Sequence, residues 1–295
     1  MNKTLLSAAL AATCILPQLA LAQSAPASPH TLTGNLGFVT DYRFRGISQT
    51  FEQPAIQGGI DYSHASGFYA GTWASNVYGG ASAQPLGVAY FNGSMEWDFY
   101  GGFKFEVAKD LMLDVGLLYY WYPGAKWANP GKDKYDNTEL YIGASYKWLS
   151  AKYSHALSDY FGIKSNTVGF GAYPGTGGWG VQSDGLTPTS NCANSNDGSK
   201  NSYYFEINAN YPLSDKLTLI GHVGNLTVKN YGAFDYTDWK LGLSYDLNGW
   251  TLGAAYVDTD AKKDVYRTAK IEGGPTLNVK ETSKGTLVLS IGKTF

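Results

Sequence analysis

Cysteine is nearly absent from this 295-residue chain, which has only Cys14 and Cys192. Cys14 falls in an N-terminal segment that we expect to be removed, so the mature protein keeps one thiol. One thiol forms no intrachain disulfide and no cysteine metal cluster. The histidines are scattered, no H-E-x-x-H zinc signature is present, and no segment resembles a nucleotide site. We therefore predict that the protein has no metal and no cofactor.

An excess of basic charge is missing as well. The chain has 22 Lys and Arg against 24 Asp and Glu, and residues 1–22 contain one Lys and no acid, so 22 − 1 = 21 basic residues remain against 24 acidic ones. A nucleic-acid partner is excluded on this balance, because such proteins need a basic surface. The chain beyond residue 22 also lacks an apolar run of about 20 residues, the length that a membrane-spanning helix needs.

Residues 1–22 have the pattern of an export signal. Lys3 precedes an apolar run over residues 5–16, and an A-x-A site ends at Ala22. A basic start, a short apolar core and small residues before the cleavage point are typical of a secretory signal peptide. The run is too short for a spanning anchor and is followed by Pro17. We predict cleavage after Ala22.

What the chain does have in quantity is aromatic residues, at 15%, with 23 Tyr, and 36 Gly. Apolar and polar residues alternate in segments of about ten residues, as in strands whose two faces meet different surroundings. After a short lead over residues 23–31, we predict one all-β domain over residues 32–295, a transmembrane antiparallel up-and-down β-barrel. Its twelve expected strands cover residues 32–43, 55–64, 68–77, 94–107, 111–122, 138–148, 149–157, 202–211, 216–225, 238–247, 250–258 and 286–295.

The connections between these strands alternate between short and long. Outer-membrane barrels have short periplasmic turns and long external loops, so this alternation favours a barrel over a soluble sandwich. It also places both termini in the periplasm. The tight turns are expected at residues 65–67, 108–110, 148–150, 213–215 and 248–249, and the longer connections at 44–54, 78–93, 123–137, 158–201, 226–237 and 259–285.

Charge decides which face of the strands meets lipid. In the fourth strand Trp97 and Phe99 share one face, whereas Glu96 and Asp98 share the other. A basic residue on the lipid face costs roughly 2–4 kcal/mol at mid-bilayer, and an acid costs less. The apolar face is therefore expected to point outward, since an apolar interior of this size would leave a cavity that side chains could hardly fill. Aromatic girdles near the strand ends are expected from Tyr62, Trp73, Tyr119, Trp121, Trp148, Tyr153, Tyr211, Trp250, Tyr256 and Phe295.

The chain ends on an alternating strand whose last residue is Phe295. Leu287, Leu289, Ile291 and Phe295 fall on one face of it. This ending looks like that of bacterial outer-membrane barrels, whose assembly machinery recognises a C-terminal aromatic residue. Together with the export signal, it predicts a location in the bacterial outer membrane, among its lipids and lipopolysaccharide.

Three stretches carry a resemblance to a known family: YRFRGISQ at residues 42–49, PAIQGGIDY at 54–62 and SGFYAGTWASN at 66–76. They resemble the TorF-type porin family of Gram-negative bacteria, and a similar length and strand pattern extend the resemblance over the mature chain. The resemblance implies an outer-membrane barrel and passive transport. It supplies no substrate and no catalytic residue.

Charged residues opposite the apolar face are expected to line the lumen. Both signs occur, as in a pore that presents opposed acidic and basic side chains to a polar solute. Arg43 and Arg45 fall at the external end of the first strand, where they would attract anionic solutes. We predict a porin-like channel for passive diffusion of small polar solutes. The expected pore-lining residues are Asp41, Arg43, Asp61, Glu96, Asp98, Lys104, Glu106, Asp114, Glu139, Lys147, Lys152, Glu206, Asp238, Lys240 and Asp246.

Alternatives stay open at this point. The same charged residues would also form a network of ion pairs that fills the lumen, giving a non-conducting structural or adhesive barrel. The loop over residues 158–201, rich in Gly, Ser, Asn and Thr, either folds inward and narrows the pore or lies outside.

A membrane hydrolase is the less favoured alternative. It would need a serine activated by a nearby histidine. His64 and Ser66 have a suggestive spacing but adjoin a predicted periplasmic turn, whereas a lipase acting on external lipid would need them at the opposite rim. We predict that the protein is not an enzyme.

Overall fold

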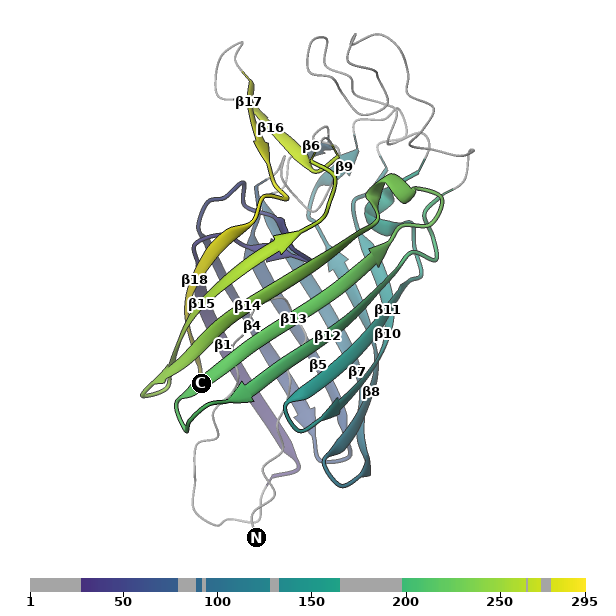
Figure 1. Cartoon of the computed structure of the whole chain (residues 1–295). Coiled ribbons are helices and arrows are strands. Elements are labelled where there is room, and N and C mark those ends of the chain that lie inside the picture. The colour runs from purple at the N-terminus through teal and green to yellow at the C-terminus, as the bar shows by residue number, and fades with distance from the viewer. Residues whose placement is uncertain are drawn as a thin grey trace.

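Twelve strands form a closed antiparallel β-barrel in the computed structural model, which describes residues 28–78, 89–91, 94–127, 133–164, 198–263, 265–271 and 277–295. The first strand, β1 (His30–Val39), pairs with both β4 (Ala55–His64) and the last strand, β18 (Thr286–Thr294), and this closes the ring (Figure 1). The predicted fold class is confirmed. The expected signal peptide and most of the expected lead lie outside the described residues.

The remaining strands follow one another around the ring in sequence order, each hydrogen-bonded to the next. All twelve expected strands are present, and most end within two residues of their predicted bounds. The first strand is the exception, because it ends at Val39 where the chain turns into the barrel. The other wall strands are β5 (Phe68–Asn76), β7 (Met95–Ala108), β8 (Leu111–Trp121), β10 (Asn137–Tyr146), β11 (Leu149–Ala156), β12 (Tyr203–Pro212), β13 (Leu217–Thr227), β14 (Tyr236–Leu247) and β15 (Trp250–Thr259).

Small elements lie in the long connections at one end of the barrel. No helix among the described residues is long and apolar enough to cross a membrane. The small elements are the paired strands β2 (Arg43–Phe44) and β3 (Ile47–Ser48), β6 (Ala89–Phe91) and β9 (Ala125–Trp127), and β16 (Arg267–Ile271) and β17 (Leu277–Glu281), with the single 3₁₀ turns η1 (Tyr160–Gly162) and η2 (Gly232–Phe234).

At the opposite end of the barrel, the connections between the described strands are all tight turns, as the alternating loop lengths predicted (Figure 1). Asp110, Lys147 and Asn248 take positive φ values of 64°, 53° and 53°, which reverse the chain within a few residues. The chain also ends there. The backbone N–H of Phe295 donates to the carbonyl of Gly34 near the start of β1, at 2.9 Å. We call this the short-turn end and the other the long-loop end.

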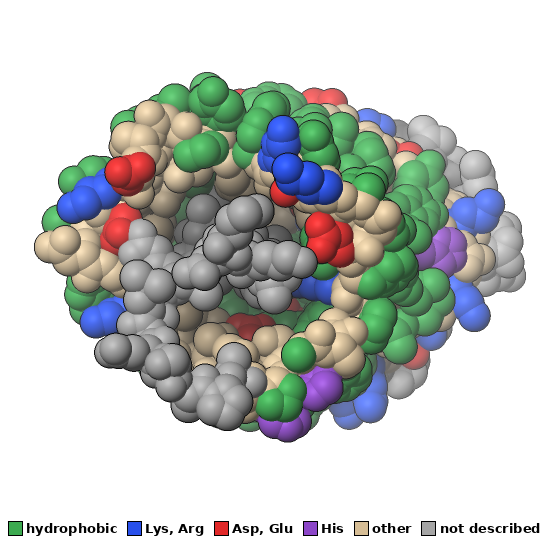
Figure 2. Space-filling model, turned by 90° about the horizontal axis from the view of Figure 1, so that it is seen from below, with side chains coloured by type: hydrophobic (Ala, Val, Ile, Leu, Met, Phe, Trp, Pro, Cys, Tyr) green, Lys and Arg blue, Asp and Glu red, His purple; other side chains and the backbone are tan. Residues whose placement is uncertain are grey.

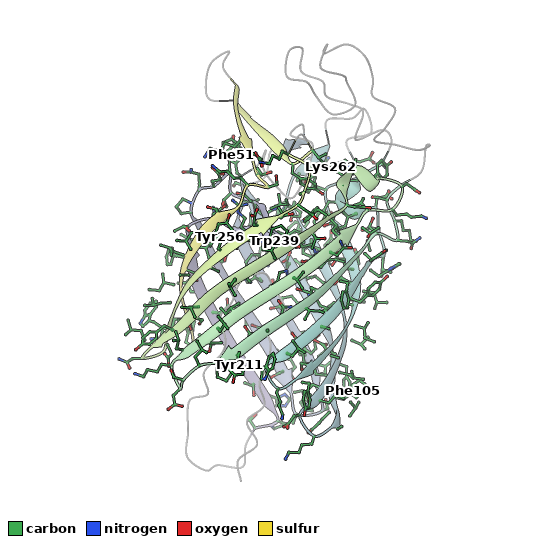
Figure 3. The ribbon with its side chains drawn as sticks, in the orientation of Figure 1. Phe51, Phe105, Tyr211, Trp239, Tyr256 and Lys262 are labelled. Atoms are coloured by element: carbon green, nitrogen blue, oxygen red, sulfur yellow. The ribbon has the colours of Figure 1, made fainter. Side chains whose placement is uncertain are left out.

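Apolar side chains cover the outside of the barrel, as predicted. In β14, Trp239 is 39% exposed whereas the neighbouring inward residue Asp238 is buried. Seen from the short-turn end, hydrophobic side chains surround the outside, and charged side chains lie at the rim and within the hollow (Figure 2). Aromatic side chains mark both ends of the wall, with Trp239 and Tyr256 toward the long loops and Tyr211 toward the short turns (Figure 3).

Trp73 departs from the expected aromatic girdles. It lies on β5 and is buried on the inner face, where its ring packs edge-on against Tyr42 at 5.4 Å between centroids. The outward residues of this strand are instead the alternate ones, beginning with Phe68. The girdle prediction for Trp73 was therefore wrong, because the alternation of side chains along a strand decides which face a residue occupies, even near the end of the strand.

A charge placed on the outer face tests this arrangement. Leu241→Arg, at the middle of β14, is expected to lower the free energy of unfolding in lipid vesicles by about 2–4 kcal/mol. Ser244→Arg, on the inner face of the same strand, is the matched control and should cost less. Denaturant unfolding followed by tryptophan fluorescence measures both. Equal costs for the two variants would contradict an outer face in contact with hydrocarbon.

Candidate functional site: a lumen crossed by an inward segment

Residues 41–52, between β1 and β4, fold back into the barrel, and we call them the inward segment. All but the last of them are buried. On one side the Tyr42 hydroxyl donates to Glu96 of β7, at 3.1 Å. On the other side Gly46, with φ 81°, lies so close to β14 that an added Cβ would be 2.7 Å from the Cβ of Asp238. Because β7 and β14 lie half a turn apart around the ring, the inward segment crosses the lumen.

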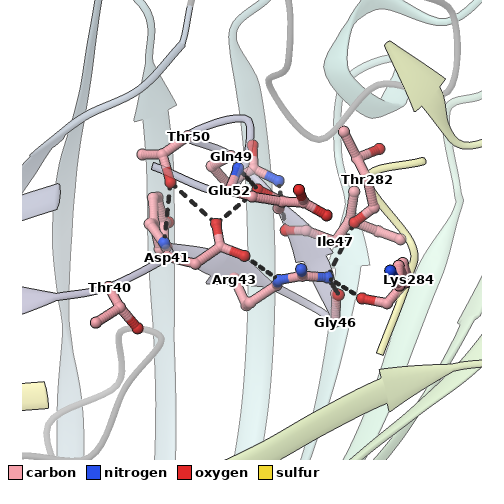
Figure 4. Close-up of polar contacts among 12 residues, drawn as sticks. Thr40, Asp41, Arg43, Gly46, Ile47, Gln49, Thr50, Glu52, Thr282 and Lys284 are labelled. Atoms are coloured by element: carbon pink, nitrogen blue, oxygen red, sulfur yellow. Dashed lines mark hydrogen bonds and ion pairs between the residues drawn. The ribbon is translucent and has the colours of Figure 1, made fainter. Parts of the chain in front are cut away.

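The inward segment is held in shape by its own charged pair (Figure 4). Arg43 Nε donates to Asp41 Oδ2 at 2.6 Å, and Arg43 Nη1 donates to the carbonyl of Gly46 at 3.1 Å. The other carboxylate oxygen, Asp41 Oδ1, accepts from the hydroxyls of Ser48 at 2.6 Å and Thr50 at 3.0 Å. These bonds satisfy the buried carboxylate, which would otherwise be costly to remove from water.

A second set of contacts ties the inward segment to the chain that leads into β18. Arg43 Nη1 also donates to the carbonyls of Thr282, at 3.0 Å, and Lys284, at 2.9 Å (Figure 4). The Lys280 ammonium pairs with Glu52 at 3.1 Å, and both of these side chains are about one third exposed. The inward segment is thus anchored at the long-loop end of the barrel.

Arg45 joins the inward segment to the barrel wall at β10 and β12. Its Nη2 donates to Glu139 Oε2 of β10 at 2.8 Å, and its Nη1 donates to the Tyr160 hydroxyl of η1 at 3.1 Å. Its guanidinium carbon lies 4.2 Å from the ring centroid of Tyr204 on β12. Burial alone would lower the pKa of Arg45, but the Glu139 carboxylate raises it well above its ordinary value. Arg45 therefore stays charged in this buried position.

The arginines do not lie where the sequence placed them. Arg43 and Arg45 were expected at the external end of the first strand, where they would attract anionic solutes. The structure buries both and pairs them with Asp41 and Glu139, so neither presents a free positive charge to solvent. The expectation was wrong because β1 ends at Val39 and the chain turns inward.

The wall around the inward segment carries more acid than base. Glu96 and Asp98, on β7, are 0% and 3% exposed, and Glu139 and Asp238 are also buried. Within the described part of the chain, no Lys or Arg nitrogen lies within 4.0 Å of Glu96 or Asp98. Among the same residues, one carboxylate oxygen of Asp98 has no hydrogen-bond partner. A positive charge at this level would therefore meet an acidic surface.

Asp238 is part of a polar chain with His222 of β13. His222 Nε2 lies 2.9 Å from Asp238 Oδ1, and Nδ1 lies 2.7 Å from Asn208 Oδ1. The Tyr204 hydroxyl donates to Asp238 Oδ2 at 2.8 Å. The imidazole thus bridges Asn208 of β12 and Asp238 of β14 on the inner face of the barrel.

Nearer the short-turn end, the expected lumen residues form pairs across neighbouring strands. Lys152 Nζ lies 2.7 Å from Glu206 Oε1, and Lys104 Nζ lies 3.8 Å from Asp114 Oδ2. Asp61 accepts a hydrogen bond from the Tyr100 hydroxyl at 2.6 Å. Lys240 lies opposite His222 in the register of β13 and β14. Apart from Asp114, which is buried, these side chains are partly buried, in contrast to those at the inward segment.

Three of the expected pore-lining residues lie at the short-turn end of the barrel, and two lie on the inward segment. Lys147 is exposed in the tight turn after β10, with its ammonium 5.1 Å from the ring centroid of Tyr146. Asp246 holds the turn after β14 by accepting from the N–H of Gly249 at 2.8 Å. Glu106 is exposed near the end of β7. Asp41 and Arg43 belong to the inward segment and not to the wall.

The tyrosines of the lumen were missed at the level of sequence. The alternation that placed the charged residues inside also places these tyrosines inside, so a signal for them was available. Tyr160 carried no such signal, because it lies in a long connection. Of the 158–201 loop, the structure describes residues 158–164 and 198–201. The inward tyrosines of the wall are Tyr69, Tyr100, Tyr120, Tyr141, Tyr204 and Tyr236.

Aromatic rings surround the Arg45 guanidinium of the inward segment. Phe44 packs edge-on against Tyr120 and Phe161, at centroid distances of 5.5 and 5.7 Å. Tyr160 packs edge-on against Phe161 at 4.7 Å. This cluster excludes water from the Arg45–Glu139 pair, which strengthens the attraction between the two charges.

Comparison with known proteins gives a family and distant structural likenesses. Residues 23–295 match the model of a family described as "Bacterial protein of unknown function (Gcw_chp)". No curated protein sequence matches the chain. The family description assigns no function and does not carry the TorF-type name, so the resemblance at residues 42–76 stays a prediction.

Among solved structures, the chain is similar to two porins and to an outer membrane channel from Pseudomonas putida F1. For the KdgM porin the identity is 9%, the TM-score is 0.45, and the alignment covers 89% of this chain and 98% of that one. For the NanC porin the values are 12%, 0.45, 90% and 99%, and for the Pseudomonas channel 10%, 0.41, 92% and 97%. Likenesses this distant carry no argument about solutes.

The buried pair that holds the inward segment makes a first prediction. Glu139→Gln leaves Arg45 charged and unpaired, which costs about 3–5 kcal/mol for a buried pair. Hydrogen exchange of the backbone amides of Tyr42 and Gln49 should then quicken by a hundredfold or more, since about 1.4 kcal/mol is tenfold. Lys280→Met removes a more exposed pair and, as the control, should change exchange by about tenfold at most. Equal effects would contradict the role given to Glu139.

Tyr160 makes a second prediction. Burial raises its pKa to about 12, and the Glu139 carboxylate adds to the effect while Arg45 opposes it. A raised pKa stabilises the folded protein below the ordinary value of about 10, and this stabilisation is lost as pH rises toward 12. The difference in ultraviolet tyrosinate absorbance between wild type and Tyr160→Phe should show a transition near pH 12. A transition at pH 10 would show that Tyr160 is in solvent.

Proposed function

This chain belongs to the Gcw_chp family of bacterial proteins, and we propose that it is an outer-membrane channel for passive diffusion of small polar solutes. One observation carries the proposal. The outer wall is apolar, whereas the inner wall presents charged groups of both signs, with hydroxyl and amide groups between them. Polar solutes pass through a lumen that is lined by ionic and polar groups. A barrel that served only as a membrane anchor would not need such a lining.

The apolar outer wall and the unlike ends of the barrel support a location and an orientation in the outer membrane. An apolar outer wall requires hydrocarbon around it, and the expected signal peptide would export the chain to the outer membrane. We place the short-turn end in the periplasm and the long-loop end outside, facing lipopolysaccharide. Phe295 is 72% exposed at the short-turn end, where the assembly machinery would find its side chain.

The inward segment supplies the constriction of the proposed channel. It crosses the lumen at the long-loop end, and the partly buried pairs of Lys104 and Lys152 lie between it and the periplasmic mouth. A solute entering from outside would have to displace the segment or pass beside it. We therefore propose a narrow channel whose conductance depends on the position of residues 41–52.

A non-conducting barrel is the second candidate, because the buried Arg43–Asp41 pair holds the inward segment in shape and the buried Arg45–Glu139 pair holds it against the wall. An enzyme is not proposed. His64 Nδ1 lies 2.8 Å from Ser66 Oγ, but the same nitrogen also accepts from the backbone N–H of Ser66, as part of a turn at the short-turn end. Among the described residues no carboxylate is hydrogen-bonded to His64, so no third group orients it.

Single-channel recording in planar bilayers tests the proposal. The wild type is expected to give small current steps, and replacement of residues 43–50 by a short Gly-Ser linker should enlarge them several-fold, because the lumen is then unobstructed. Glu96→Gln with Asp98→Asn in the linker variant should reduce its preference for cations, measured as a reversal potential across a salt gradient.

The control is folding of each variant, followed by heat-dependent migration in gels and by circular dichroism. Silent bilayers for both the wild type and a folded linker variant would exclude the channel and leave the structural barrel. Hydrolysis of phospholipid that His64→Ala abolishes would instead establish the enzyme.

A further inference from the structure

The surroundings of Arg45 are those of a bound ligand. A carboxylate (Glu139), a phenol hydroxyl (Tyr160) and an aromatic face (Tyr204) all meet its guanidinium, at 2.8, 3.1 and 4.2 Å. None of these three groups belongs to the inward segment. Two lie on wall strands, and the third lies on η1. The barrel therefore provides a complete site, and the inward segment inserts a side chain into it.

The chemistry of this site selects a planar or compact organic cation. A carboxylate forms its strongest hydrogen bonds with guanidinium and ammonium donors. An aromatic face attracts a cation within about 6 Å of its centroid, and the attraction grows when water is excluded. Asn137 and Tyr120 donate to Glu139 at 3.1 and 3.4 Å, so its carboxylate is held in place by the wall and not by Arg45 alone.

The charge of the wall favours the same class of ligand. The bases at this level, Arg43 and Arg45, both belong to the inward segment. Once the segment is withdrawn, Glu96, Asp98 and Glu139 remain on the wall with no Lys or Arg nitrogen from the rest of the described chain within 4.0 Å. An unobstructed lumen thus presents a buried acidic surface that a cation would neutralise.

We propose that Glu139, Tyr160 and Tyr204 form a binding site for an organic cation of the guanidinium or primary-ammonium class, and that Arg45 occupies this site as an internal ligand. The inference rests on the proposed channel function, since it names the solute that the channel admits. A cation that binds the wall site does so only when Arg45 has left it. By linkage, such a cation favours the state in which the inward segment is displaced.

The test uses Arg45→Ala, which empties the site, in planar bilayers. Methylguanidinium added to the external side should reduce the current through Arg45→Ala channels, whereas urea, which is neutral and of similar shape, should not. Adding Glu139→Gln to Arg45→Ala should weaken this block about tenfold or more, because a charged hydrogen-bond partner is lost. Lys280→Ala, added to Arg45→Ala as the control, removes a cation outside the site and should leave the block by methylguanidinium unchanged.

Direct binding separates this inference from the channel proposal. Calorimetry of methylguanidinium with refolded Arg45→Ala should give heat that Glu139→Gln removes, whether or not the barrel conducts. Current without methylguanidinium block, or block and heat unaffected by Glu139→Gln, would overturn the cation site and leave the channel standing. Silent bilayers with Glu139-dependent heat would overturn the channel and leave the cation site.

Should Arg45→Ala not fold, the wild type gives the same test. Methylguanidinium, compared with sodium at equal ionic strength, should speed hydrogen exchange in residues 41–52 and not in the wall strands. Equal exchange in the two salts would overturn the proposal.

Discussion

Hydrocarbon neither hydrogen-bonds a backbone nor solvates a charge, and this constraint determines the architecture of the protein. Each strand must pair on both sides, so the sheet closes on itself, with β18 returning to β1. Ionic groups must avoid the outer wall, so they collect inside. The alternation of Leu241 outside with Lys240 inside is the local expression of this rule.

The charged residues that hydrocarbon excludes from the outer wall lie in the lumen, where they are arranged in two ways. Toward the short-turn end, Lys152 and Glu206 pair across neighbouring strands in partly hydrated surroundings. Toward the long-loop end the inward segment brings its own arginines into a ring of acids, and Arg45 pairs with Glu139. Glu96 and Asp98 of the wall have no Lys or Arg partner at this level among the described residues, so a positively charged solute would be favoured there in place of Arg45.

The sequence predicted the barrel well because each strand repeats one physical rule. Alternation fixes which residues face lipid, and tight turns such as Asn248-Gly249 fix where strands reverse. The same rule failed at the first strand. Asp41 and Arg43 continue the alternation of β1, but they leave the wall and bond to each other inside the lumen. Periodicity records a two-faced environment and cannot distinguish a strand from a segment that folds between two walls.

The candidate site was harder to predict than the fold for a related reason. Glu139 was expected inside, since it alternates with Leu140 on a strand. Its partner Arg45 lies in a long connection, as does Tyr160, which accepts from Arg45, and in such connections no period links position to direction. Contacts between residues separated by 94 and 115 positions depend on how loops fold against the wall, which a single sequence does not encode as a local pattern.

The burial of the inward segment is the claim on which the constriction and the cation site both depend, and thiol labelling tests it directly. Ile47→Cys in a background with Cys192→Ser would be exposed to a membrane-impermeant maleimide in lipid vesicles, with the exposed Lys262→Cys as the reference. The structure predicts that the thiol at position 47 labels only after unfolding, because Ile47 is 1% exposed. Labelling of the folded protein as fast as at position 262 would show that residues 41–52 lie outside the lumen.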